Sequence, residues 1–400
     1  MTEQGGWRTI AVVTGWQLAA SLCYYAPFAA TPFLRDGFGL SRALVGVVVT
    51  ALTLGYTVAL FPAGALVDGF GERRVLLAAL VALAAGAVAV TVAPTYPLLL
   101  AAAALLGAAY APAMPGTNRA LVRRIAERRR GLAMGVKQVG VTAGSGLSAL
   151  LVTGLAGVLT WRAGFHAVAA VAVVVTVLFA VGYRGDAGDG RLSRPDVGSL
   201  RANRAYLLLV AAGAFLGAGL FTTVGYAILY LTESAGAAVV AAGASLALAQ
   251  AAGSTGRVVA GGLADRLAGR SAVPAHAPLA VLGGQAAVAG LLFAALALSD
   301  PPFAVAVAVF VGLGFTALGL TGVYYSALTD LVAPDEVGAA TAGGQTALNA
   351  GALLAPPSFG ALADALSYGA GWAALAACAA VAVVLLAGAW HAADRREAAF

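Results

Sequence analysis

The sequence has few charged residues. Only 10% of its 400 side chains are Asp, Glu, Lys or Arg and 61% are hydrophobic, so the polar side chains are too few to cover a water-soluble globule of this size. This excludes a soluble enzyme. The two cysteines, Cys23 and Cys378, lack the paired spacing of a metal or redox site. The chain also offers no cluster of metal ligands and no embedded nucleophile–base pair, so we expect no catalytic site, metal or cofactor.

Long apolar stretches take the place of the missing charge. A helix that crosses the hydrocarbon core of a bilayer needs about 20 apolar residues, and the chain has twelve stretches of that order. We therefore predict an all-α multi-pass membrane protein with twelve transmembrane helices. The predicted spans are 9–34, 43–67, 75–93, 97–122, 131–156, 161–182, 205–231, 237–264, 274–298, 302–329, 337–363 and 367–391.

The excess of basic residues is explained by membrane topology. If both termini are cytoplasmic, 17 arginines lie in cytoplasmic segments and only Arg35, Arg42 and Arg162 lie outside. This bias follows the positive-inside rule and predicts cytoplasmic termini in the cell membrane. The net charge of +6 therefore gives no reason to expect a nucleic-acid partner, and the partners expected are the lipid bilayer and a small molecule.

The two halves of the chain resemble each other. A polar stretch at 183–204 is predicted to be a cytoplasmic linker between two six-helix bundles, 1–182 and 205–400. GALVDGFGERR at 64–74 follows the second span, and GGLADRLAGR at 261–270 follows the eighth. An internal repeat of this kind predicts two pseudo-symmetric bundles and alternating access at their interface.

These repeated loops resemble the signature of the major facilitator superfamily, Gly, three residues, Asp, Arg, one residue, Gly, Arg, Arg or Lys. The first copy has Gly69 and Glu72 where basic residues are usual, and the second has an extra residue before Gly269 and Arg270. The resemblance implies the superfamily fold, transport as a monomer, and loops that help to close the cytoplasmic side. The candidate gating residues are Gly64, Asp68, Gly71, Arg73, Arg119, Gly261, Asp265 and Arg266.

Three cations fall inside predicted spans, where a charge costs at least ~2.5–3.5 kcal/mol. Arg119 lies near the cytoplasmic end of the fourth span and is expected to reach the surface or to pair with Asp68. Lys137, the only lysine in the chain, lies about 10 Å into the fifth span, and Arg257 lies about 12 Å into the eighth. No carboxylate falls inside any predicted span. The alternatives to substrate contact are snorkelling for Lys137 and, for Arg257, a structural role at helix-end carbonyls or in a pair with Asp68 or Asp265.

In the superfamily the fifth and eighth helices meet, so the resemblance implies that Lys137 and Arg257 could face one cavity. Two cations in one cavity favour an anionic substrate between them, and GRVVAGGLADR at 256–266 resembles the monocarboxylate and oxalate:formate branches at Arg257. We hypothesise that the chain transports a mono- or dicarboxylate as an exchanger, uniporter or substrate–proton symporter. The candidate substrate-binding residues are Lys137, Arg257, Tyr24, Tyr325, Gln138, Gln250, Gln345 and Asn349.

Other functions stay open at this point. A proton-linked multidrug exporter is the nearest alternative, although GVTAGSGLS at 140–148 lacks the proline typical of that branch. A nitrate carrier would be expected to have an arginine inside the second span, and that span has none. A non-transporting receptor is the alternative from another class of protein.

Overall fold

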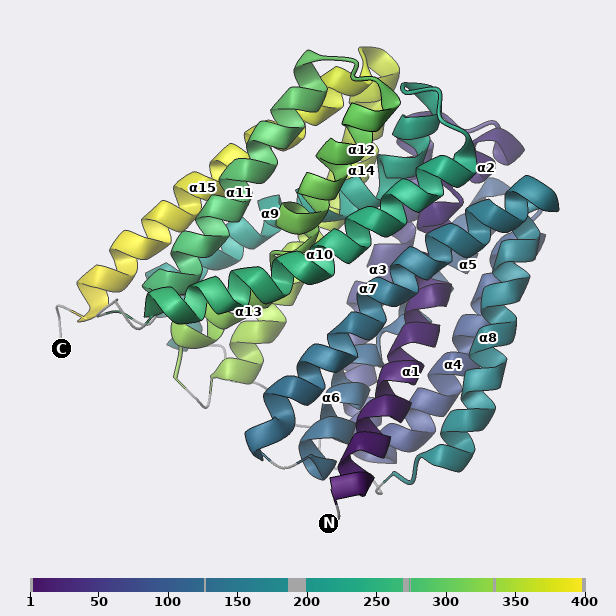
Figure 1. Cartoon of the computed structure of the whole chain (residues 1–400). Coiled ribbons are helices and arrows are strands. Elements are labelled where there is room, and N and C mark those ends of the chain that lie inside the picture. Colours follow the sequence, from purple (N-terminus) through teal and green to yellow (C-terminus); the bar gives the residue numbers. More distant parts are fainter. Residues whose placement is uncertain are drawn as a thin grey trace. The chain divides into compact units, whose positions relative to one another are not determined.

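The computed structural model describes residues 3–125, 127–185, 199–268, 273, 275–333 and 336–397. The regular elements of these residues are all helices, which confirms the prediction of an all-α protein (Figure 1). The first half of the chain contains α1 (Glu3–Ala29), α2 (Thr31–Phe38), α3 (Arg42–Phe70), α4 (Glu72–Val92), α5 (Tyr96–Tyr110), α6 (Ala113–Arg124), α7 (Glu127–Val158) and α8 (Trp161–Gly182). The second half contains η1 (Ser199–Ala202), α9 (Arg204–Glu233), α10 (Val239–Ala268), α11 (His276–Leu298), α12 (Phe303–Leu313), η2 (Gly314–Leu318), α13 (Thr321–Asp330), α14 (Val337–Ala365) and α15 (Tyr368–Glu397).

Every predicted span coincides with a helix or with an interrupted run of helices. Ten of them, among the described residues, are long and apolar enough to cross a membrane. The other two predicted spans correspond to α1 and α14, which have 27 and 29 residues and are therefore long enough. They are less apolar because α1 contains Gln17 and Ser21, and α14 contains Gln345 and Asn349. The chain is thus a multi-pass membrane protein.

Large apolar side chains on the surface are consistent with a lipid environment. Phe61 is 67% exposed, Leu291 is 72% exposed and Val258 is 75% exposed, although each lies well inside a helix. Water would oppose such exposure, whereas lipid tails accept it. Polar side chains such as Gln17, Ser21 and Asn349 are instead buried.

The helices form two compact units. Unit 1 comprises residues 1–39, 47–193 and 238–247, and unit 2 comprises residues 40–46, 194–237 and 248–400. The beginning of α3 thus belongs to unit 2 and the beginning of α10 to unit 1, which the predicted bundles 1–182 and 205–400 did not anticipate. Most of the predicted linker at 183–204 lies outside the described residues.

Glycines allow close helix contacts in unit 1. A Cβ added to Gly140 or Gly144 of α7 would lie under 3.0 Å from backbone oxygens of α1. A Cβ on Gly55 of α3 would meet the Ala104 carbonyl of α5, and one on Gly107 of α5 would meet the Leu52 carbonyl of α3. The first helix of this half therefore packs against the fifth, and the second against the fourth.

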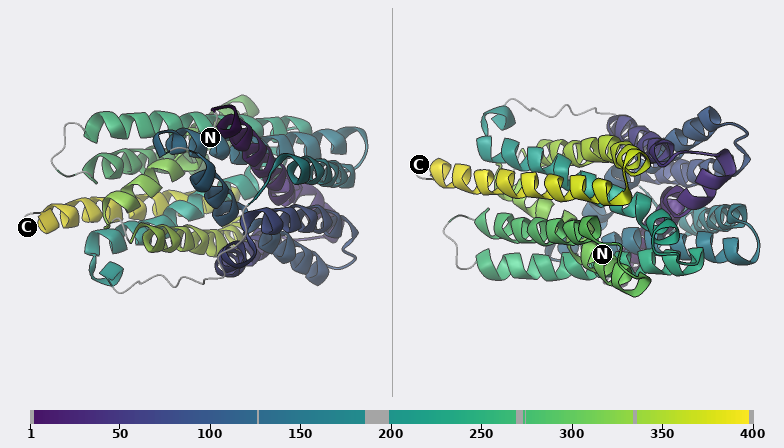
Figure 2. Two further views of the ribbon diagram at one scale, coloured as in Figure 1. Left: turned by 90° about the horizontal axis from the view of Figure 1, so that it is seen from below. Right: turned by 90° about the horizontal axis from the view of Figure 1, so that it is seen from above.

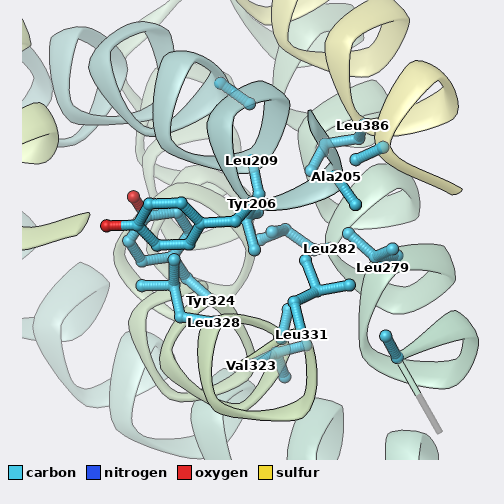
Figure 3. Close-up of a cluster of buried hydrophobic side chains, with 14 of the residues drawn as sticks. Ala205, Tyr206, Leu209, Leu279, Leu282, Val323, Tyr324, Leu328, Leu331 and Leu386 are labelled. Carbon is cyan, nitrogen blue, oxygen red and sulfur yellow. The ribbon is translucent and has the colours of Figure 1, made fainter. Parts of the chain in front are cut away.

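Unit 2 repeats this packing between the equivalent helices. Gly217 of α9 and Gly351 of α14 each approach the backbone of the other helix, as do Gly256 of α10 and Gly314 of η2. The remaining contacts of the unit include α11 and α15, which lie side by side (Figure 2). The buried apolar cluster of unit 2 contains Tyr206, Tyr324 and leucines of α9, α11 and α13 (Figure 3).

A carboxylate from α14 caps the beginning of α3. Asp364 accepts hydrogen bonds from the backbone N–H groups of Arg42, at 3.1 Å, and Ala43, at 2.9 Å. The Arg42 guanidinium forms an ion pair with Glu233 at 2.7 Å. Side-chain capping satisfies N–H groups that a helix leaves without partners in its first turn. These contacts join α3, α9 and α14 at one end of unit 2, beside a cavity of about 440 Å³.

Candidate functional site

Two spans are interrupted at equivalent places in the two halves. The fourth span consists of α5 and α6, which are separated at Ala111 and Pro112, and the tenth consists of α12, the π-helix η2 and α13 (Figure 1). Interrupted helices at corresponding positions of a repeat often mark the binding region of a transporter, and π-helices are frequent at functional sites. We therefore expect the candidate functional residues to lie around these two interruptions, one in each unit.

Arg257 lies beside the interruption of the tenth span. Its Nε and Nη2 atoms donate hydrogen bonds to the Leu318 carbonyl, at 3.3 and 3.2 Å, where the π-helix ends. The close approach of Gly256 to Phe315 brings α10 near enough for these bonds. A Cβ added to Gly322 of α13, one helical turn before Tyr325, would lie 4.0 Å from the Arg257 Cβ. Arg257 thus satisfies a helix carbonyl, as the structural alternative predicted, and is half-buried against the helix that carries Tyr325.

Tyr325, Gln345 and Asn349 form a row of hydrogen-bonded polar side chains. The Tyr325 hydroxyl donates to Gln345 Oε1, and Gln345 Nε2 donates to Asn349 Oδ1 at 2.9 Å. Asn349 is fully buried, and its Nδ2 donor has no hydrogen-bond partner among the described residues. A buried donor left without a partner costs about 1–3 kcal/mol. The structure therefore brings together three predicted substrate-binding residues and leaves one N–H donor available.

Lys137 lies beside the interruption of the fourth span. Its Nζ atom donates to Asn118 Oδ1 at 2.7 Å and lies 3.9 Å from the Met114 sulfur, both on α6. The side chain is only 2% exposed, so it does not snorkel to the surface. Lys137 and Arg257 thus occupy comparable places, each bonded to the interrupted span of its own half. Whether they share a cavity stays a prediction.

Tyr24 belongs to an aromatic cluster of unit 1. Its ring stacks on that of Tyr110, with the centroids 4.3 Å apart. The ring centroids of Tyr25 and Tyr56 lie 5.0 and 6.0 Å from that of Tyr24. Gln17 Nε2 donates to the Tyr110 hydroxyl at 2.9 Å. Tyr24 is buried, so its direct contact with a substrate stays a prediction.

The two remaining predicted site residues are amides. Gln138 follows Lys137, is half-buried, and its Oε1 acceptor has no partner within the described part of the chain. Gln250 is buried on α10, two helical turns before Arg257. Each amide is therefore on the same helix as one of the two cations.

The first signature loop forms a charged cluster in unit 1. Arg119 Nη1 pairs with Asp68 Oδ1 at 2.6 Å, which is one of the two arrangements that the sequence suggested. Its Nε lies 3.4 Å from Glu72 Oε2, and the Tyr183 hydroxyl donates to Glu72 Oε1 at 3.0 Å. Arg73 donates to the carbonyls of Tyr183 and Ala180. These contacts connect the ends of α3, α4, α6 and α8.

Glu72 corrects one sequence interpretation. Helix α4 begins at Glu72, three residues before the predicted start at 75, and the carboxylate is fully buried. The departure from the family signature at this position thus has a structural reason, because Glu72 neutralises Arg119 inside the helix bundle. A buried carboxylate accordingly lies within a membrane-capable helix, although none was expected there.

The signature glycines differ in their roles. Gly71 has a φ of +82° at the beginning of α4, a conformation that favours glycine. A Cβ at Gly64 or Gly261 would meet no atom within 4 Å in the described structure, so neither glycine permits a close helix approach here. Asp265 and Arg266 are exposed at the end of α10, and Gly269 and Arg270 lie outside the described residues.

Several residues of these clusters were not identified from the sequence. Asn118 and Met114 bind Lys137, Gln17 and Ser21 bind the Tyr110 hydroxyl, and Glu72 binds Arg119. A signal was available for Gln17 and Ser21, which are four residues apart and hence on one face of an otherwise apolar helix. Asn118 likewise stands inside a predicted span.

Two helical units with polar contacts at equivalent interruptions define a multi-pass transporter of small molecules. The family model of the Major Facilitator Superfamily matches residues 13–332. The chain therefore belongs to this superfamily, is a secondary transporter and is not an enzyme.

The relatives include transporters with and without a described substrate. The chain is 28% identical over 357 residues to an uncharacterised MFS-type transporter of Mycobacterium tuberculosis, found in two strains, covering 86% of this chain and 76% of the relative. It is 25% identical over 150 residues to the hexuronate transporter of Bacillus subtilis, covering 38% of this chain and 36% of that protein.

Solved structures of two other transporters share the fold. A bacterial homologue of the human lysosomal transporter Spinster has a TM-score of 0.78 at 16% identity, over 100% of this chain and 98% of that chain. A variant of the nucleoside transporter NupG has a TM-score of 0.76 at 14% identity, over 96% and 99% of the two chains.

Proposed function

We propose that the protein carries a small organic anion, a mono- or dicarboxylate, across the cell membrane by alternating access. The observation that supports this most directly is the polar row of unit 2. Arg257 packs against α13 one helical turn from Tyr325, and the row ends at the Nδ2 donor of Asn349, which has no partner among the described residues. A ligand that satisfies an N–H donor and a guanidinium must offer oxygen acceptors and negative charge. A carboxylate offers both.

Two further observations support an anionic substrate. Lys137 of unit 1 has no carboxylate partner among the described residues, so a positive charge on its amine is left for an anion to balance. One relative is named as a transporter of hexuronate, a carboxylate. We propose that Lys137, Tyr24, Gln138 and Gln250 contribute to the same function, and that both termini are cytoplasmic.

A ligand panel tests the proposed function. The purified full-length protein is heated with small mono- and dicarboxylates, neutral sugars, amines or inorganic anions, and its melting temperature is recorded. A ligand present at 100 times its Kd stabilises the folded state by ~2.7 kcal/mol. We expect an increase of several degrees with at least one carboxylate. An increase with amines or neutral sugars alone would contradict an anionic substrate.

The charged cluster around Arg119 is proposed to act as a gate. Replacing Asp68 by Asn removes an ion pair worth on the order of 1 kcal/mol, and if the pair exists in only one transport state the turnover changes by about fivefold. We expect this change in tracer exchange between proteoliposomes and medium, with ligand affinity altered less than about twofold. Asp300→Asn, an exposed carboxylate outside the cluster, is the matched control. A selective loss of affinity in Asp68→Asn would assign the residue to the binding site instead.

A further inference from the structure

Lys137 has an unusual environment for a cationic side chain. Its Nζ atom has one oxygen partner, Asn118 Oδ1 at 2.7 Å, and one weak acceptor, the Met114 sulfur at 3.9 Å. Both partners are neutral, and only 2% of the side chain is exposed. An ammonium has three N–H donors and no acceptor. The described surroundings of Lys137 therefore satisfy an ammonium incompletely.

No charge in the surroundings compensates for an ammonium. Helix α7 packs against α1, α6, α8 and the beginning of α10, which carries no ionisable residue up to Ala247. No ionisable side chain of the described residues lies within hydrogen-bond or ion-pair distance of Nζ. Asp68 and Glu72, the two carboxylates that contact α6, both pair with Arg119. The ionisable residues on the packed helices, apart from those at the start of α1 and α7, are Arg8, Cys23, Tyr24, Tyr25, Arg119, Arg123, Arg124, Arg162 and His166.

The residue type adds an independent argument. The chain contains 22 arginines and one lysine, and the lysine occupies this buried position. A guanidinium stays charged in proteins, whereas an amine can lose its proton when water is excluded. A buried charge without a partner costs several kcal/mol. A neutral amine, with two donors and one acceptor, fits the described contacts better than an ammonium does.

We propose that Lys137 is the proton-coupling residue of transport, an amine that takes up one proton when the anion is bound and releases it when the anion leaves. This rests on the anion transport proposed above. The amine lone pair accepts the proton from hydronium in the aqueous phase, so one N–H bond forms, one O–H bond of hydronium breaks and a water molecule is left. Because the coupling between two binding sites is reciprocal, protonation of Lys137 raises the affinity for the anion by the same factor by which the bound anion raises the affinity of Lys137 for the proton. Each anion is then carried together with one proton.

The test uses the full-length protein and the carboxylate that raises its melting temperature most in the ligand panel. Proteoliposomes with the wild type, Lys137→Arg or Lys137→Gln are assayed for two activities. One is exchange of labelled anion at equal pH on both sides, and the other is accumulation driven by a pH gradient. We expect Lys137→Arg to lose at least about tenfold more of gradient-driven accumulation than of exchange, because a guanidinium keeps its proton. His166→Gln, an exposed titratable residue, should retain both activities.

Proton uptake is measured directly in case the larger arginine prevents folding. The anion is added to protein in weakly buffered detergent solution containing a pH-sensitive dye. The wild type should take up about one proton per bound anion, and Lys137→Gln should take up none. Accumulation by Lys137→Arg, or proton uptake by Lys137→Gln, would overturn the inference while leaving anion transport intact. If no carboxylate binds the wild type, the proposed function fails and the coupling role fails with it.

Discussion

Replacing Arg257 by Gln should lower the affinity for the transported carboxylate by about 30-fold or more. Loss of a hydrogen-bonded charge from a partly buried pair costs ~2–5 kcal/mol. The glutamine retains a polar group near the Leu318 carbonyl, so the end of the π-helix is disturbed less than by an apolar residue. The Kd is obtained from the dependence of the melting temperature on ligand concentration, and uptake is measured in proteoliposomes.

Two control variants separate binding from structure. Arg257→Lys keeps the positive charge but loses the planar fork of donors, so we expect an intermediate affinity. Arg201→Gln removes an exposed arginine of η1 and should leave the affinity unchanged. If Arg257→Gln lowers the melting temperature of the ligand-free protein but binds the carboxylate normally, Arg257 is structural and the anion site lies elsewhere.

Replacing Gly107 by Ala should destabilise unit 1 by at least ~2–3 kcal/mol, as expected for overpacking at a tight contact. The added methyl group would overlap the Leu52 carbonyl of α3, and the backbone on both sides of this contact cannot move aside as a flexible side chain could. The melting temperature of the purified protein and the fraction that elutes as a monodisperse peak are the measurements.

Gly154→Ala is the matched control for this substitution. Gly154 lies on α7, and a Cβ there meets no atom within 4 Å in the described structure. Alanine favours a helix over glycine by ~0.5–1 kcal/mol, so the melting temperature should stay unchanged or rise slightly. Equal destabilisation by the two substitutions would show that close packing of α3 and α5 is not the cause.

The helical class and the twelve spans could be predicted because membrane insertion acts on local composition. A backbone in hydrocarbon must satisfy its own hydrogen bonds, and a helix achieves this within one segment. The site could be predicted only in part. Lys137, Arg257, Gln345 and Asn349 could be proposed from the sequence because a polar residue in an apolar span is costly and therefore conspicuous. The partners Asn118, Met114 and Leu318 depend on which helices approach each other, which local composition does not specify.

The burial of Glu72 also could not be predicted from the sequence. By the family signature it is an anomaly at the end of a loop, where a carboxylate would be exposed to water. In the structure α4 begins at this residue, and the carboxylate is buried between Arg119 and Tyr183. These residues are separated by 47 and 111 positions along the chain, so their interaction follows from helix packing.

The sequence alone determined that this chain is a helical membrane protein with an internal repeat and three cations inside its spans, because hydropathy, charge bias and repeated motifs are local properties. Only the tertiary structure decided the partners of those cations. Arg119 is neutralised by Asp68 and Glu72, Arg257 binds the carbonyl at the end of a π-helix, and Lys137 is buried against neutral groups. The physical reason is that a buried charge takes its state from neighbours a few ångströms away, which are contributed by other helices.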